Sequence, residues 1–95
     1  MTLGVMRVAG EKAQRVADAL TSTTFKMLQL LSKERLSVSA IAERLDLSQA
    51  YVSEQVQLLH ELGMIKVNYE TGKRGISKMC ELAVKEITIL IKPEP

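Results

Sequence analysis

The pattern of apolar and polar residues changes its period partway along the chain. Between residues 11 and 63, apolar positions recur at steps of three and four, which is the spacing of one buried face of an α-helix. From residue 65 the step becomes two, because Ile65, Val67 and Tyr69 alternate with polar residues as in a half-buried strand. The sequence therefore predicts a mainly α fold with a small β-hairpin, in the α+β class.

Four helices are expected before residue 64. The second follows a run of Ser and Thr residues, which favour helix caps over helix interiors, and it ends near Lys33. The third and fourth are separated only by Asp46-Leu47-Ser48, so they are joined by a tight turn. The expected inward-facing residues are Ala13, Val16, Ala17 and Leu20 in the first helix, Phe25, Leu28 and Leu31 with Leu20 or Met27 in the second, Ile41, Ala42 and Leu45 in the third, and Val52, Val56, Leu59 and Leu62 or Leu58 in the fourth.

Local signals define the ends of the last two helices. Ser37 or Ser39 can cap the third helix and Ser48 the fourth, because a hydroxyl before a helix accepts a hydrogen bond from its first turn. Gly63 can adopt the left-handed conformation that ends the fourth helix, and Met64 is then placed against the preceding turn, as in a Schellman cap.

The hairpin is expected over residues 64–82. Its turn is the segment 71–75, which contains two glycines, and the returning strand starts at Ile76. Cys80 is expected to fill a strand position as a small hydrophobe.

Two further strands are expected, at residues 3–8 and 86–92. Residues 79–87 also fit a helix, but we favour a strand with a bend near Lys85-Glu86, where the apolar positions change parity. The two terminal strands can pair with each other in one sheet or across a two-fold axis, and the small Ala13/Ala17 face of the first helix can pack against a second copy.

Composition narrows the class of protein. A chain of 95 residues is expected to form one domain over residues 1–95, and so small a domain is marginally stable alone, which favours a homodimer. One Cys and one His exclude a disulfide framework and a structural zinc site. No catalytic constellation, phosphate loop or membrane-spanning run is present in the sequence. We therefore expect a cytoplasmic protein that is not an enzyme and has no cofactor, metal or membrane partner.

The net charge of +2 hides an uneven distribution. Residues 36–65 carry one basic and four acidic side chains, whereas residues 1–35 carry six basic and three acidic ones. Residues 66–78 carry four basic side chains against Glu70 alone. The predicted hairpin is thus the most basic surface of the chain.

The segment from Leu36 to Val67, LSVSAIAERLDLSQAYVSEQVQLLHELGMIKV, resembles the winged helix-turn-helix of ArsR-type transcriptional regulators. The likeness covers roughly residues 13–76 and rests on the joint spacing of Leu45, Leu47, Val52 and Gly63 before a basic hairpin. The resemblance implies a three-helix core plus a wing, with the helix-turn-helix at 36–62, the wing at 64–82 and the terminal strands as additions. Metal-sensing members of that family use several thiolate or imidazole ligands, which this chain lacks.

The resemblance also implies a site for double-stranded DNA. The fourth helix would enter the major groove by its N-terminal half, and its capped start would offer backbone N–H groups to a phosphate. The tip of the wing would lie along the backbone or in the minor groove. The expected DNA-binding residues are Ser48, Gln49, Ala50, Tyr51, Ser53, Glu54 and Gln57 on the helix, and Lys66, Lys73, Arg74 and Lys78 on the wing.

One departure from the family pattern keeps two hypotheses open. Residues 48–62 contain no Lys or Arg, and Glu54 stands where family members often have a basic or neutral polar residue. Phosphate neutralisation dominates affinity for DNA, so binding would depend on the wing with help from Lys12, Arg15, Lys26 or Arg44. The first hypothesis is a dimeric DNA-binding transcriptional regulator that reads two half-sites about one helical turn apart. The alternative is a protein–protein interaction module of a larger complex with weak or no DNA binding.

Overall fold

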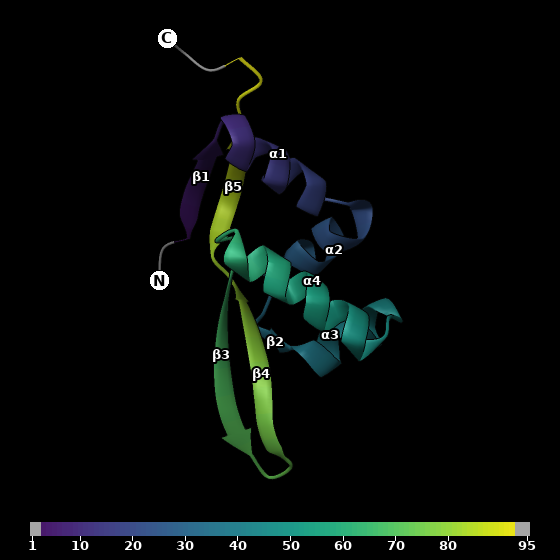
Figure 1. The fold of residues 1–95 in the computed structure, drawn as a ribbon. Helices are drawn as coiled ribbons and strands as arrows, with labels where there is room; N and C mark the ends of the chain where they lie inside the picture. The colour runs from purple at the N-terminus through teal and green to yellow at the C-terminus, as the bar shows by residue number, and fades with distance from the viewer. Residues whose placement is uncertain (1–2, 93–95) are drawn as a thin grey trace.

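Four helices form the body of the molecule, and a long hairpin projects from it (Figure 1). The computed structural model describes residues 3–92. No helix within that range is long and apolar enough to cross a membrane. The elements follow in the order β1 (Gly4–Val8), α1 (Gly10–Ala19), α2 (Ser22–Leu31), β2 (Leu36–Ser37), α3 (Val38–Leu45), α4 (Gln49–Glu61), β3 (Ile65–Gly72), β4 (Gly75–Leu82) and β5 (Val84–Ile89).

The strands form two separate sheets at opposite ends of the body. In the first sheet β4 lies between β2 and β3, and all pairs are antiparallel. Strands β3 and β4 are the wing, and Gly72 pairs with Gly75, so that Lys73 and Arg74 are the two-residue loop at its tip. The second sheet consists of β1 and β5 in parallel (Figure 1). The terminal strands thus pair with each other inside one chain.

The predicted caps are present and fix where α3 and α4 begin and end. Ser37 Oγ accepts from the backbone N–H of Ala40 at 3.1 Å, and Ser48 Oγ accepts from that of Tyr51 at 3.1 Å. Gly63 has a φ of +84°, and the N–H of Met64 donates to the carbonyl of Leu59 at 2.9 Å. The left-handed Gly63 and this hydrogen bond are features of a Schellman motif, as the sequence predicted.

Helix α4 lies at the centre of the core. Its Val52, Val56 and Leu59 side chains have no exposed surface, and Leu62 rather than Leu58 completes the buried stripe. The other elements contribute the remaining buried apolar residues, among them Val16 from α1, Met27 from α2, Ile41 from α3, Cys80 from β4 and Val8 from β1. Helix α4 itself packs against α1, α3 and β3.

Two residues expected inside α1 and α2 are exposed. Phe25 is 53% exposed, because α2 begins at Ser22 and its inward positions are Thr24, Met27, Leu28 and Leu31. Thr24 is fully buried, and its hydroxyl donates to the carbonyl of Ala19 at 2.5 Å. Ala17 is also exposed, since α1 buries Ala13, Val16 and Ala19 instead.

The strand predictions also need correction. Tyr69 is 68% exposed, because by that residue β3 has passed the edge of the body and has no core to cover. The break before the last strand lies at Ala83, not at Lys85-Glu86. Ala83 donates to the carbonyl of Met64 at 2.9 Å and accepts from the N–H of Gly4 at 3.0 Å, so it is where the chain passes from one sheet to the other. The last strand covers 84–89 rather than 86–92.

Candidate nucleic-acid interface

A groove separates the start of α4 from the returning strand of the wing. It is lined by Ser37, Val38, Ser39, Gln49, Ala50, Ser53, Ile76, Ser77 and Lys78. The structure therefore brings three of the predicted helix residues, Gln49, Ala50 and Ser53, to the same groove as one predicted wing residue, Lys78. Five further residues, from 37–39 and 76–77, were not predicted as part of the site.

The start of α4 presents backbone donors next to this groove. Ser48 caps the helix, and Ser48, Gln49 and Ala50 are all exposed. The first-turn N–H groups of a helix lack carbonyl partners and lie at the positive end of the helix dipole, where they favour an anion. The hydroxyl of Ser39 donates to Gln49 Oε1 at 3.4 Å, a contact between α3 and α4 that orients the glutamine amide.

The predicted residues of α4 divide into three faces. At 3.6 residues per turn, Gln49 and Ser53 share the wing side, whereas Ala50, Glu54 and Gln57 lie opposite the core. Tyr51 is about 200° around the axis from Gln49 and lies on the far flank, where it is 37% exposed. Gln57 is held by Glu61, whose Oε1 accepts from Gln57 Nε2 at 3.1 Å. Tyr51, Glu54 and Gln57 do not line the groove.

The basic residues of the wing are spread along its length. Lys66 is exposed near the base of β3, Lys78 is half-buried beside the groove, and the exposed Lys73 and Arg74 occupy the tip. Glu70, the acidic residue among them, forms an ion pair with Arg35. That pair offsets the negative charge on the wing, so the field around the tip remains positive.

The wing also presents apolar groups on the side that faces the groove. Strand periodicity places Tyr69 on the same face as Lys78, its cross-strand partner, and Ile76 two residues before Lys78 shares that face. Tyr69 and Ile76 are 68% and 71% exposed. Alternation counted along both strands, rather than charge alone, was the sequence signal that identifies these two residues.

The basic residues outside the wing contribute unequally. Arg44 forms an ion pair with Glu34 at 3.1 Å, so its charge is offset. Lys12 and Arg15 lie on α1, at the end of the molecule opposite the wing (Figure 1). Arg44, Lys12 and Arg15 are therefore less suited than the wing residues to neutralise a phosphate beside the groove.

The wing contributes one free thiol to the core. Cys80 is fully buried, and burial raises the pKa of its thiol, with a smaller opposing effect from the charge of Lys78. The thiol is therefore neutral at physiological pH and behaves as the small core hydrophobe that was predicted. Within residues 3–92, no three His, Cys, Asp or Glu side chains come close enough together to hold a metal ion.

The sequence and fold match known proteins over this same region. The model of a helix-turn-helix domain family matches residues 20–68, about half of the chain. The transcriptional regulator AdcR of Streptococcus pneumoniae serotype 2 is 39% identical over 75 residues, which are 79% of this chain and 47% of that protein. The chain thus spans about half the length of this curated relative.

Solved structures give the same result. The adhesin competence repressor AdcR of Streptococcus pyogenes is 33% identical with a TM-score of 0.59, over 66% of this chain and 46% of that one. The homodimeric winged helix-turn-helix DNA-binding domain of a possible ArsR-family regulator from Mycobacterium bovis is 24% identical with a TM-score of 0.66, over 77% and 65% of the two chains. The chain therefore belongs to the helix-turn-helix domain family and has the winged form of that fold seen in ArsR-type regulators.

Proposed function

We propose that the protein is a sequence-specific DNA-binding transcriptional regulator that acts as a homodimer. The observation that carries this proposal is the groove itself, where the capped start of α4 and the basic wing lie on one side of the molecule. The major groove of B-DNA admits an α-helix, and a second element beside that helix then meets the phosphate backbone. The transcriptional regulators that this chain resembles support the same assignment.

In this arrangement the faces of α4 have separate tasks. Gln49, Ala50 and Ser53 meet base edges, because they line the protein groove between α4 and the wing. The amide of Gln49 can pair with adenine. Ser48 and the first-turn N–H groups meet a phosphate on the wing side. Tyr51, on the far flank, reaches the backbone of the other strand through its hydroxyl. Glu54 and Gln57 lie deeper along the helix and adjust selectivity.

Most of the affinity comes from the wing. The helix supplies no Lys or Arg between residues 48 and 62, so phosphate neutralisation falls to Lys66, Lys73, Arg74 and Lys78. Each neutralised phosphate contributes about 0.9 to the slope of log affinity against log salt concentration. Binding is then strongly salt-dependent through one small hairpin in each subunit.

Replacement of Lys73 and Arg74 together by Ala tests the wing assignment. The salt slope of duplex binding, measured by fluorescence anisotropy, should fall by about two for each protomer. The matched control is Lys85→Ala with Lys92→Ala, which removes the same charge from the exposed part of the chain around β5. An equal fall in slope for both double variants would show that total charge, and not the wing, governs binding.

A test of base reading uses selection of bound fragments from randomised DNA. The wild-type protein should return a two-fold repeat of half-sites, and Gln49→Ala should relax the preference at one position of each half-site by about 1–3 kcal/mol. Selection that returns no preferred sequence would contradict specific recognition while leaving general DNA binding intact.

A second function is favoured by the outward surface of α4, which exposes Glu54 and Glu61 without a Lys or Arg. This face suits a basic partner protein, so the alternative is a winged helix-turn-helix used as a protein-interaction module. A titration with random-sequence duplex at low salt distinguishes the two functions. Binding in the micromolar range supports the regulator, and no binding at tens of micromolar supports the protein module.

A further inference from the structure

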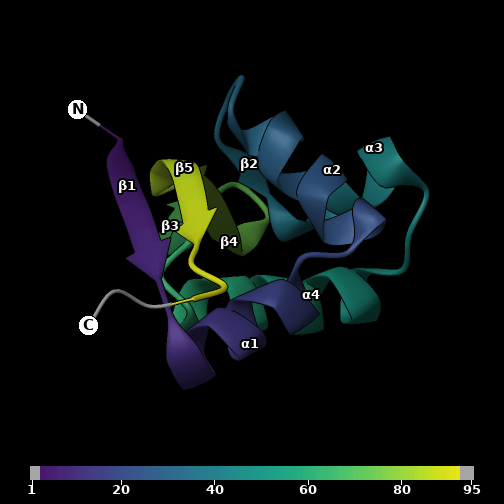
Figure 2. The ribbon, with the colours of Figure 1, turned by 90° about the horizontal axis from the view of Figure 1, so that it is seen from above.

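The sheet of β1 and β5 has an open edge. It lies at the end of the body away from the wing, with β1 outermost (Figures 1 and 2). Within residues 3–92, β5 is the sole strand that pairs with β1. Parallel pairs are less stable than antiparallel ones, parallel sheets are usually covered, and two strands alone are marginal in water. Such an edge is a template for a further strand.

The backbone groups available at this edge can be assigned. The N–H of Leu90 donates to the carbonyl of Val8 at 2.8 Å, so the backbone groups of Val8 face β5. In a parallel ladder, alternate residues direct both backbone groups to the same neighbouring strand. Three residues earlier along β1, Val5 therefore directs its N–H and carbonyl away from β5. Val5 is 56% exposed, so this residue is not covered by the rest of the body.

We propose that β1 pairs in antiparallel fashion with β1 of a second copy, which forms a continuous four-stranded sheet in the order β5, β1, partner β1, partner β5. Such a contact is isologous, since the same strand on each subunit meets its equivalent across a two-fold axis. It raises the sheet above the three strands needed for independent stability.

The composition of β1 fits its own copy better than a charged partner. The strand GVMRV carries one charged residue, Arg7, among apolar ones. Like charges directly opposite each other destabilise a sheet, so the register with Arg7 opposite the partner's Arg7 is disfavoured. In one neighbouring register the partner's Val5 lies opposite Val5, and in the other the partner's Arg7 does. In both registers Arg7 and the partner's Arg7 are not directly opposite each other. Antiparallel self-pairing therefore satisfies the edge without a second sequence.

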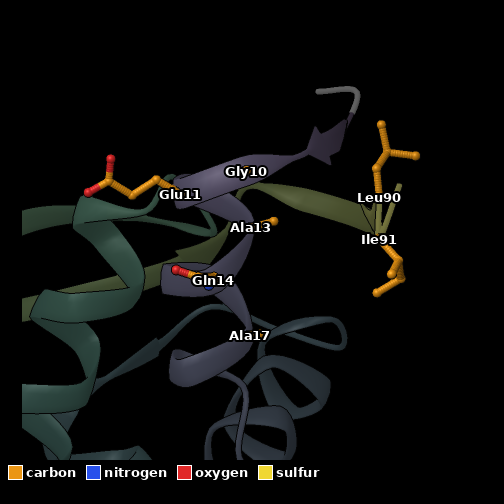
Figure 3. A pocket seen from close by; sticks show the side chains of 7 residues that line it. All are labelled: Gly10, Glu11, Ala13, Gln14, Ala17, Leu90 and Ile91. Carbon is orange, nitrogen blue, oxygen red and sulfur yellow. The ribbon is translucent and has the colours of Figure 1, made fainter. Parts of the chain in front are cut away.

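A competing surface lies along α1. A hollow there is lined by Gly10, Glu11, Ala13, Gln14, Ala17, Leu90 and Ile91 (Figure 3). Figure 3 shows the side chains of Leu90 and Ile91 pointing to opposite sides of their strand end, so they do not form one apolar wall. Glu11 and Gln14 add polar groups to the rim. This surface offers small residues for a helix contact but no row of directed backbone groups.

The first test measures oligomeric state by sedimentation equilibrium over the micromolar range, without DNA. The wild-type chain should show twice the 10.5 kDa mass of one chain. Val5→Pro removes an N–H that serves no bond to β5 and leaves the strand on an edge where proline is tolerated. It should raise the dimer dissociation constant about tenfold or more, as should Val5→Lys, which places a charge at the edge. Ala17→Glu, in the hollow along α1, is the control that should leave the constant unchanged.

Two outcomes of that test would overturn the proposal. One is a wild-type chain that stays monomeric throughout. The other is a dimer weakened by Ala17→Glu and not by either change at Val5. If circular dichroism shows that Val5→Pro fails to fold, Val5→Lys carries the comparison, because it keeps the backbone N–H.

The second test is cross-linking of Val5→Cys with a short bis-maleimide. Either permitted register brings the two Cβ atoms within about 5–8 Å. The wild-type chain is the background, since its Cys80 is fully buried, and Thr71→Cys on the exposed part of the wing is the matched exposed thiol. Dimer cross-linked equally through Thr71→Cys and Val5→Cys would overturn the proposal. Both tests omit DNA, so a failure here is separate from a failure of the wing variants in DNA binding.

Discussion

Helix α4 and the wing form the two halves of the proposed interface by opposite means. Val52, Val56 and Leu59 of α4 have no exposed surface, and the helix is capped at its start by Ser48. The outer half of the wing projects beyond the body, and every residue from 71 to 77 is exposed. The helix has no Lys or Arg, whereas the wing has four such residues. The packing of α4 therefore determines the shape of the interface. The two basic residues at the tip of the wing supply positive charge from positions that make no contact with the core.

This difference predicts that stability and affinity can be changed separately. Changes on the inner side of α4 should alter folding first and binding only as a consequence. Changes at the tip of the wing should alter binding and leave the free energy of unfolding nearly constant, because exposed positions away from buried groups usually shift it by about 0.5 kcal/mol or less.

The largest expected effect comes from Leu59→Ala. The side chain is fully buried at the centre of the core, so its loss leaves a cavity and should lower the free energy of unfolding by about 2–5 kcal/mol. Urea unfolding measures the change. Ile76→Ala removes an isoleucine that is 71% exposed on the wing and should cost less than about 0.5 kcal/mol. Similar losses at both positions would mean that the wing is packed as tightly as α4.

The next effect is that of the cap, where stability and binding meet. Ser48→Ala removes the hydroxyl that accepts from Tyr51 N–H and should cost about 0.5–2 kcal/mol in the free energy of unfolding. Ser48→Asp restores an acceptor, so it should recover stability, yet its negative charge should weaken binding to a phosphate at that helix end. If Ser48→Asp bound duplex as well as wild type, the start of α4 would not contact a phosphate.

Helix α4 was predictable from the sequence because its local signals agree. The spacing of Val52, Val56 and Leu59 marks one face, and Ser48 and Gly63 mark the ends. Each signal acts within one or two helical turns, where neighbouring residues alone determine the outcome.

Local patterns do not predict burial at positions where it depends on distant elements of the fold. Phe25 and Tyr69 have the right spacing for burial, but periodicity does not reveal that α2 turns Thr24 inward instead of Phe25, or that β3 has passed the edge of the body at Tyr69. The groove was only partly predicted for a related reason. Ser37 reaches it because β2 pairs with β4, with Ser37 opposite Met79, and that long-range pairing leaves no mark in either local pattern.

Removal of a negative charge from α4 should raise the affinity for duplex DNA. Glu54→Gln keeps the side-chain length and removes an exposed negative charge from the outward face of the helix. Repulsion from nearby phosphates then falls, so duplex affinity at low salt should rise about two- to fivefold. Glu61→Gln is the control, since it lies about 10 Å further along the helix axis and should change affinity less. An unchanged affinity for Glu54→Gln would place this face away from the DNA.

The smallest expected effect is a change in the pH dependence of stability, and it tests whether the base of the wing is part of the core. Cys80 lies on β4 but is fully buried, and burial holds the pKa of its thiol above the ordinary range. The folded state therefore favours the protonated thiol. This contribution to stability is fully present at neutral pH and is lost as the pH rises past the ordinary thiol pKa of about 8.5. One proton limits the loss to about 1.4 kcal/mol for each pH unit. Urea unfolding between neutral pH and the alkaline range should thus show a steeper decline for wild type than for Cys80→Ala, which has no titrating group at position 80 and is otherwise identical. Parallel declines would mean that the thiol titrates alike in both states, and that the base of the wing is open to water like its tip.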